Sequence, residues 1–229
     1  MGTMLVTLET RAPSPPAVIR PEWLKVRAPQ GPNYRELKAL VEAGRLHTIC
    51  ESAHCPNIGE CWEQRTATFM ILGNVCTRRC GFCAVQKGRP LEVDWDEPRR
   101  VAEAVARLGL EYAVVTSVDR DDRKDGGATL FARTIEEIRR HTPGCQVEVL
   151  VPDFQGSIEA LRIVLDARPD MFNHNIETVE RLYKPVRPGS RYRRSLELLD
   201  AVRDITPEIP TKSGMMLGLG ETVDEVEQA

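Results

Sequence analysis

The chain has 229 residues, of which 41% are hydrophobic and 28% charged, a composition typical of a soluble globular enzyme of one or two domains. Its formal net charge of −3 argues against a nucleic-acid-binding protein that works through a general basic surface. No stretch approaches the roughly 18 apolar residues of a membrane-spanning helix, and the N-terminus lacks the apolar core of a secretory signal, so we expect a cytoplasmic protein without a membrane or nucleic-acid partner.

The first 32 residues form a proline-rich leader. Prolines at six positions in residues 1–32 exclude a long helix or a central strand there. We expect a disordered tail over residues 1–18, and packing of Trp23 and Leu24 against the body of the protein.

An N-terminal extension, residues 33–66, follows the leader. Its first part predicts a short helix that Asn33 caps and that Gly44 ends. One face of this helix is apolar and carries Tyr34, Leu37 and Val41.

Strands and helices then alternate to the end of the chain. Five strands are expected, at residues 68–72, 112–117, 146–151, 171–177 and 212–217. The helices after the first four strands show apolar residues three or four positions apart: Val101, Ala102, Val105 and Leu108 behind Pro98; Phe131, Ile135 and Ile138; Ile158, Leu161 and Leu165 behind a Ser157 cap; Leu196, Leu199 and Val202. This alternation predicts a parallel sheet in an open or partial barrel. A last helix from near Thr222 has only about two turns before Ala229, which is marginal for a helix, so we expect the sequence to be part of a longer protein.

The seven cysteines are distributed unevenly. Six of them lie between Cys50 and Cys83, and only Cys145 stands apart, as a thiol without an expected role. An odd number of cysteines in a chain without an export signal favours metal or redox chemistry over a disulfide framework.

Cys76, Cys80 and Cys83 form a C-x3-C-x2-C motif directly after the first strand. Three thiolates on one loop can hold a [4Fe–4S] cluster and leave one iron open for a substrate or cofactor. The alternative is a zinc-bound or merely buried trio, but zinc usually has a closed set of four ligands.

A second triad, Cys50, Cys55 and Cys61, has the spacing C-x4-C-x5-C and also leaves a fourth position open. Zinc here would need His47 or His54 as a fourth ligand, and His54 is a strained choice because it is adjacent to Cys55.

The segment CTRRCGFC resembles the signature of radical S-adenosylmethionine (SAM) enzymes. Both triads together are similar to the lipoyl synthase family, and the resemblance extends from about residue 21 to residue 228 through RPEWLKVRAP, CPNIGECW, TSVDRDDRKDGGA, HNIETVERLYKPVRP and KSGMMLGLGET. It implies an α/β fold: a partial (β/α)6 TIM-like barrel of the radical SAM type over residues 67–229, with the cysteine-rich extension in front.

The resemblance also implies an activity, namely insertion of two sulfur atoms at C6 and C8 of an octanoyl chain on a lysine of a lipoyl carrier protein. One [4Fe–4S] cluster, on Cys76, Cys80 and Cys83, would bind and reductively cleave SAM. The other, on Cys50, Cys55 and Cys61, would supply the sulfur. An electron donor such as a ferredoxin or flavodoxin would be a further partner.

The family ligates its auxiliary cluster with a fourth residue, a serine in an Arg-Ser-Ser-Ser-like stretch near the C-terminus. This sequence has no such stretch and no sixth strand, which fits the expectation of a longer protein.

Further residues are candidates for binding SAM, since they follow strands or stand beside the cluster motif. They are Phe82, Ser117, Asp119, Asn173, Asn175, Glu177, Arg187, Gly218 and Gly220. We expect Asn173, Asn175 and Glu177 to share one face of the fourth strand, and His174 to point away from them. Met215 and Met216 are expected in the core. Asp121, Asp122 and Asp125 are expected to be solvated or to cap a helix, because their spacing fails as a calcium loop.

Arg78 and Arg79 lie between the cluster ligands, and two interpretations stand equal: solvated loop charges, or charges that offset a thiolate-ligated cluster. Two rival functions remain, another radical enzyme that inserts sulfur or a methylthio group, and a zinc-stabilised binding module. The cysteine spacing argues against the first rival, and metal analysis would distinguish the second from an iron–sulfur enzyme.

Overall fold

One open sheet organises the molecule, which a computed structural model describes over residues 28–229. The expected tail at residues 1–18 and the packing of Trp23 and Leu24 lie outside the described residues. The strands follow the order β1-β2-β5-β6-β7-β8. Their bounds are β1 His47–Thr48, β2 Thr68–Ile71, β5 Tyr112–Ser117, β6 Gln146–Leu150, β7 Met171–Asn173 and β8 Thr211–Lys212. The last five run parallel, which confirms the predicted partial barrel, and β1 adds an unexpected antiparallel edge beside β2.

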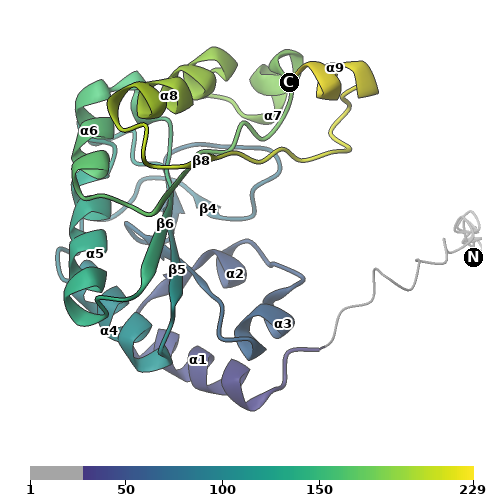
Figure 1. The fold of residues 1–229 in the computed structure, drawn as a ribbon. Coiled ribbons are helices and arrows are strands. Elements are labelled where there is room, and N and C mark those ends of the chain that lie inside the picture. Colours follow the sequence, from purple (N-terminus) through teal and green to yellow (C-terminus); the bar gives the residue numbers. More distant parts are fainter. Residues whose placement is uncertain (1–27) are drawn as a thin grey trace, which may run out of the picture.

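Four helices connect the parallel strands and cover the outer side of the sheet (Figure 1). They are α4 Glu97–Leu108, α5 Ala128–His141, α6 Ile158–Asp166 and α8 Tyr192–Ile205. Their apolar stripes pack on alternate strand residues, so that the largest fully buried side chains include Phe69, Ile71, Phe131, Ile135 and Phe172. The predicted periodicity therefore gave the correct inner face for α4 and α5.

The N-terminal extension packs at one end of this half-barrel through α1 Pro32–Ala43, α2 Ile49–Ser52 and α3 Ile58–Glu63. Gly44 ends α1 as predicted, but the Asn33 cap is wrong. Gly31 is the N-cap, because Pro32, with its fixed φ, suits the first turn. The Asn33 amide instead donates to the Glu63 carbonyl at 2.8 Å and holds α1 on α3.

The last two parallel strands are shorter than predicted. β7 ends at Asn173, and β8 contains two residues. Four residues after the end of β7, Glu177 takes a left-handed conformation with φ 63°. Contact between the two segments resumes as an isolated bridge between Glu177 and Met215.

The remaining elements lie at the carboxyl ends of the strands or close the chain. They are the two-stranded parallel sheet β3 Val75–Cys76 with β4 Gln86–Lys87, the 3-10 turns Phe154–Gly156 and Glu180–Leu182, α7 Tyr183–Val186 and α9 Val223–Gln228. Thr222 caps α9 near the predicted start.

Helix α6 begins at the Ser157 cap, whose hydroxyl accepts from the Ala160 N–H at 3.2 Å, as predicted. Leu161 is fully buried, but the inward placement of Ile158 is wrong, since 46% of it is exposed. Side chains of a helix lean toward its N-terminus, so the first residue projects beyond the packed turns.

We therefore expect Leu161→Ala to lower the free energy of unfolding by about 2–5 kcal/mol, because it leaves a cavity in the core. Ile158→Ala, in the same helix, should change it by less than about 0.5 kcal/mol. Urea unfolding followed by circular dichroism measures both. Equal losses would contradict the burial difference within α6.

Candidate functional site

The cluster loop runs from β3 to β4 and places three thiols on one wall of a cavity. Cys76 belongs to β3, and the parallel pairing of Val75 and Cys76 with β4 closes the base of the loop. The Gly88 N–H donates to the Cys76 carbonyl at 3.0 Å, and the Cys83 N–H donates to the Cys80 carbonyl at 3.3 Å. Backbone contacts thus shape the loop around the three cysteines.

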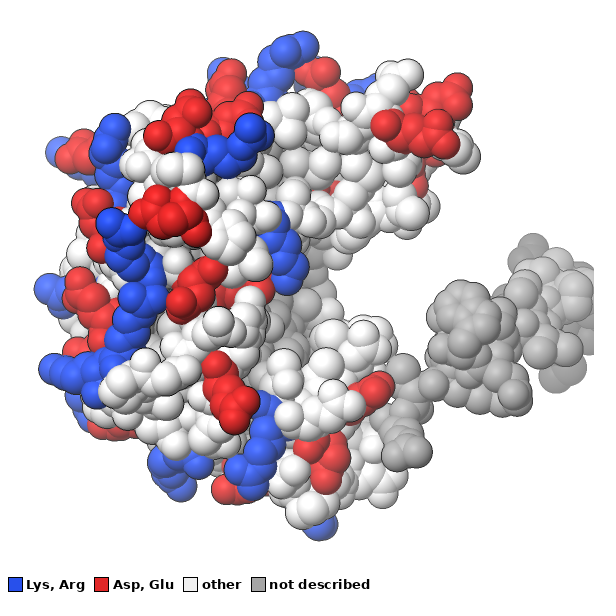
Figure 2. Space-filling model, in the orientation of Figure 1, with Lys and Arg blue, Asp and Glu red and all other residues white. Residues whose placement is uncertain are grey.

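The cavity measures about 370 Å³ and lies at the carboxyl ends of the parallel strands. Figure 2 shows the molecule hollowed on the side that faces away from the outer helices, with mostly uncharged walls. The lining residues fall into three groups: the thiols Cys76, Cys80 and Cys83; the polar side chains Arg78, Lys87, Thr116, Ser117, Asp119, Asn175, Glu177 and Arg187; and an apolar wall that includes Ile49, Ala53, Phe82, Val85, Leu150 and Met216. Six of the predicted cofactor-binding residues therefore meet in one place.

Ser117 and Asp119 stand at the end of β5 with polar atoms that the described residues leave unsatisfied. The Ser117 hydroxyl and Asp119 Oδ1 are buried and accept or donate no hydrogen bond there. Asp119 Oδ1 lies 3.4 Å from Arg78 Nε without hydrogen-bond geometry, and Oδ2 lies 3.8 Å from Cys76 Sγ. Burial raises the pKa of Asp119, and Arg78 opposes this. Unsatisfied buried acceptors of this kind suit a ligand that brings N–H donors.

Burial also changes the acidity of the thiols. Burial, with a further contribution from the neighbouring Asp119 charge, raises the pKa of Cys76 to about 11. Burial raises the pKa of Cys80 as well. Thiols bind metals only after they lose their protons, so metal loading at this loop must release protons.

Asn175, Glu177 and Arg187 also line the cavity. Arg187 is 7% exposed and donates through Nη1 to the Asn175 carbonyl at 2.9 Å. Burial raises the pKa of Glu177, whereas the nearby Arg187 charge lowers it. A carboxylate and a guanidinium in one cavity can bind the ammonium and the carboxylate of an amino acid.

The structure corrects the placement of four predicted residues. Asn173 does not share a face with Asn175 and Glu177: its amide donates to Glu148 Oε1 at 3.0 Å, in a network that also contains Lys212. Gly218 and Gly220 have φ of 96° and 112° in a turn outside the cavity. Met216 was expected in the core, but it lines the cavity.

His174 points away from the cavity, as predicted. Its ring nitrogens bond to the Val151 carbonyl at 2.8 Å and the Ser195 hydroxyl at 2.9 Å. Burial lowers the pKa of His174 to about 4, so the ring is neutral and structural.

The segment around Cys50 of the second triad contributes to the wall of the same cavity. Cys50 belongs to α2, Cys61 belongs to α3, and the Cys55 N–H donates to the Cys50 carbonyl at 3.0 Å. Burial raises the pKa of Cys61, and charges on Cys50 and Cys55 add to this. Ile49 and Ala53, on either side of Cys50 along the chain, line the cavity of the first triad.

Thiolates are the usual ligands of iron–sulfur clusters, and the three thiols of the cluster loop line the cavity. Within residues 28–229, no three His, Cys, Asp or Glu side chains converge closely enough to share one metal ion. Zinc needs its ligands on one atom, whereas each thiolate of a [4Fe–4S] cluster binds a separate iron. All seven cysteines are free thiols, and His54 is exposed.

Two buried carboxylates near the cluster loop, Asp153 and Glu97, were not among the sequence candidates. Arg78 is 4% exposed and binds Asp121 and Asp153. Asp121 is exposed to solvent, as expected, and is in addition an ion-pair partner of Arg78. Asp122 pairs with Arg120, and Asp125 caps α5 by accepting from the Thr129 N–H at 3.2 Å. Asp153 could have been found in the sequence, because it follows the third predicted strand.

Glu97 is the second such charge. It begins α4, is 4% exposed, and its Oε2 accepts from the Leu72 N–H at 2.7 Å. It therefore holds the end of β2, from which the cluster loop starts. Burial raises the pKa of Glu97 to about 7, although the hydrogen bonds from Leu72 and Gly73 lower it.

No helix in residues 28–229 has the length and apolarity needed to cross a bilayer.

Comparison with known proteins gives a consistent family. The sequence profile of the Radical SAM superfamily matches residues 70–229, and that of the N-terminal domain of lipoyl synthase of the Radical SAM family matches residues 12–55. The chain is 62% identical over 221 residues to "Lipoyl synthase" of Koribacter versatilis, which covers 96% of this chain and 71% of the relative. It is 62% identical over 207 residues to "Lipoyl synthase" of Rubrobacter xylanophilus, covering 90% of this chain and 64% of the relative.

Solved structures agree on the fold. The crystal structure of methylornithine synthase (PylB) has a TM-score of 0.52 at 13% identity, over 84% of this chain and 54% of that one. HydG, a maturase of the [FeFe]-hydrogenase, has a TM-score of 0.54 at 16% identity, over 86% of this chain and 42% of that one. At these identities the likeness supports the fold alone.

The raised pKa of Glu97 makes stability depend on pH. The folded state holds the proton more tightly than the unfolded state does, so stability falls as pH rises from about 4.5 to about 7 and is then level. Relative to Glu97→Gln, the unsubstituted protein should lose about 3 kcal/mol across this window, since one pKa unit corresponds to about 1.4 kcal/mol. Urea unfolding at several pH values measures the difference. Glu103→Gln, on the exposed face of the same helix, is the control and should follow the unsubstituted protein; a Glu97→Gln curve that does the same would contradict the assignment.

Proposed function

The chain belongs to the lipoyl synthase family of radical SAM enzymes, and from this premise we propose that it inserts sulfur at C6 and C8 of an octanoyl chain on a lysine of a lipoyl carrier protein. It spans 64% to 71% of the length of the relatives compared above. The complete reaction, its substrate and its partners are therefore proposals for the protein to which this chain corresponds.

One observation carries the proposal: the first triad lines a cavity to which the segment around Cys50 also contributes. Cys76, Cys80 and Cys83 line it directly, and Ile49 and Ala53, on either side of Cys50 along the chain, form part of its wall. An enzyme that activates a C–H bond with one cluster and takes sulfur from another must present both to the same carbon atoms. The position of the Cys50 segment in this wall supports that requirement.

We assign the radical SAM cluster to Cys76, Cys80 and Cys83. These three thiolates would hold the cluster, which would supply the electron for reductive cleavage of SAM and so the chemistry that removes hydrogen from C6 and C8. Asp119 and Glu177 can accept from the SAM ammonium, and Arg187 can bind the SAM carboxylate. Ser117, Asn175 and Phe82 are further contacts in the same cavity.

We assign the auxiliary cluster, on Cys50, Cys55 and Cys61, to the role of sulfur-donating substrate. Its region, residues 33–66, is a small unit that precedes the barrel at 67–229. The apolar wall formed by Ile49, Leu150 and Met216 excludes water and can hold an alkyl chain.

The proposed reaction also implies the partners. An octanoylated lipoyl domain is the substrate, and a ferredoxin or flavodoxin supplies electrons. The cytoplasm is the compartment, because free thiols persist in a reducing environment.

Substitutions in the two triads should separate the two roles. Cys76→Ala should abolish formation of 5′-deoxyadenosine, whereas Cys55→Ala should retain it and yield no sulfur insertion. Each should lower the iron content by about half, since each triad holds one four-iron cluster. Iron analysis and mass spectrometry after anaerobic reconstitution measure these outcomes, in the complete protein.

Cys145→Ala is the matched control, because Cys145 is a free cysteine outside both triads. It should keep the full iron content and both products. Lipoyl product from Cys55→Ala would refute the assignment of the sulfur donor.

The form of the substrate provides a second test. An octanoyl-lysine on a lipoyl domain should turn over faster than an octanoyl-lysine peptide, and free octanoate should not react detectably. The reason is that an internal methylene must be held in a near-attack geometry, which only an anchored chain provides. Product formation by mass spectrometry ranks the three substrates, and preferred turnover of the free acid would contradict the proposal.

A further inference from the structure

Two adjacent arginines of the cluster loop have opposite environments. Arg78 is 4% exposed, whereas Arg79 is exposed. Both lie between Cys76 and Cys80, so they add the same charge to the loop at nearly the same place. Only Arg78 is buried among other residues of the protein.

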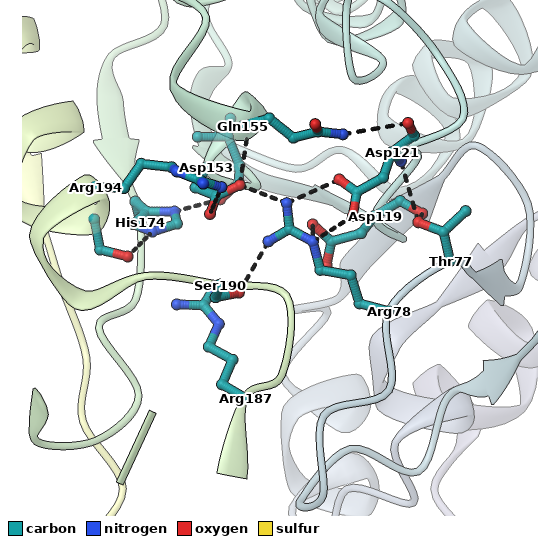
Figure 3. A network of polar contacts seen from close by, with 12 residues as sticks. Thr77, Arg78, Asp119, Asp121, Asp153, Gln155, His174, Arg187, Ser190 and Arg194 are labelled. Carbon is teal, nitrogen blue, oxygen red and sulfur yellow. Dashed lines mark hydrogen bonds and ion pairs between the residues drawn. The ribbon is translucent and has the colours of Figure 1, made fainter. Parts of the chain in front are cut away.

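The Arg78 guanidinium uses four of its five N–H groups in hydrogen bonds (Figure 3). Two go to Asp121, at 2.7 and 2.8 Å, in a bidentate pair. One goes to Asp153 at 2.5 Å, and one goes to the Ser190 hydroxyl at 2.9 Å. The three partners come from the segments that follow β5, β6 and β7.

Each partner is held in turn by other groups. Asp153 also accepts from Arg194 at 3.2 Å and from the Gln155 N–H at 3.1 Å. The Asp121 N–H donates to Thr77 Oγ1 at 3.1 Å, and Thr77 Oγ1 donates to the Asp119 carbonyl at 2.9 Å. The guanidinium thus has one position in which all its partners are satisfied.

The segments that Arg78 joins also carry the charged groups of the cavity. Asp119 is two residues from Asp121, and its Oδ1 lies 3.4 Å from Arg78 Nε. Arg187 is three residues from Ser190, and the same loop accepts a hydrogen bond at the Val186 carbonyl from the Gly81 N–H at 2.8 Å. Arg78 therefore ties the loop of thiols to the segments that bear Asp119 and Arg187.

We propose that Arg78 is a positioning residue that fixes the three thiols relative to Asp119 and Arg187, and so sets the distance between the cluster and the charged end of SAM. The proposal rests on the proposed function, because it takes SAM as the ligand of the cavity. Arg78 acts through its geometry and not only through its charge. Lysine cannot replace it fully, since an ammonium lacks the planar fork that binds Asp121 bidentately while it reaches Asp153.

The test compares Arg78→Gln, Arg78→Lys and Arg79→Gln in the complete, anaerobically reconstituted protein. Hydrogen–deuterium exchange follows the amides of residues 76–83 and 186–191, and equilibrium dialysis measures SAM affinity. The electron paramagnetic resonance spectrum of the reduced cluster, with and without SAM, reports whether SAM reaches the open iron.

For Arg78→Gln we expect about tenfold faster exchange in both segments, about tenfold weaker SAM binding, and a smaller spectral change on adding SAM. Arg78→Lys should fall between this variant and the unsubstituted protein. Arg79→Gln removes the same charge one residue away and should stay within about twofold of the unsubstituted protein. Equal effects of Arg78→Gln and Arg79→Gln, or no effect of Arg78→Gln, would overturn the proposal.

Ser190→Ala keeps the test decisive if Arg78→Gln does not fold. It removes one neutral hydrogen bond of Arg78 and should weaken SAM binding about threefold, with faster exchange in residues 186–191. Unchanged values for Ser190→Ala would then refute the positioning role. Failure of the proposed function can be distinguished from failure of the positioning role. If the proposed function is wrong, the unsubstituted protein would bind no SAM, but the hydrogen–deuterium exchange of the Arg78 variants would still show whether Arg78 fixes the two segments.

Discussion

The parallel direction of the strands is the constraint on which the site depends. Because β2, β5, β6 and β7 run the same way, their carboxyl ends open onto one rim, and the segments that follow them must share that space. Cys76, Asp119, Asp153 and Glu177 all come from such segments. No single segment contains the site, and the sheet brings it together.

This convergence concentrates charge in a place shielded from water. Asp119, Asp153 and Glu177 are acidic, and Arg78 and Arg187 are the buried cations among them. Buried carboxylates are costly unless they are paired, so the arginines are needed for the fold and for the cavity alike. Asp119 and Ser117 retain unsatisfied atoms in this otherwise paired surface, and these atoms face the cavity.

The sequence predicted the parts of the molecule that depend on local pattern. Apolar spacing gave the five parallel strands and the inner faces of α4 and α5, and cysteine spacing identified both triads. Local pattern did not predict the buried ion pairs of Arg78, whose partners lie 43, 75 and 112 positions away along the chain. It also failed for Asn173, because alternation predicts a shared face only while the strand continues, and β7 ends at that residue. Burial at Met216 and exposure at Ile158 likewise depend on neighbours that a periodic pattern does not contain.

The short edge strand β1 gives the two triads a common origin. His47 and Thr48 pair with Met70 and Phe69 of β2, Cys50 follows two residues after Thr48, and β2 leads through residues 72–74 to β3, where the cluster loop starts. The two sets of thiols therefore follow neighbouring strands of one sheet along the chain, and they do not belong to two bodies joined by a hinge. The separation between the two triads therefore depends on the pairing of β1 with β2. If the two triads hold the clusters of the proposed reaction, the substrate chain, and not the protein, would have to move between the first and the second sulfur insertion.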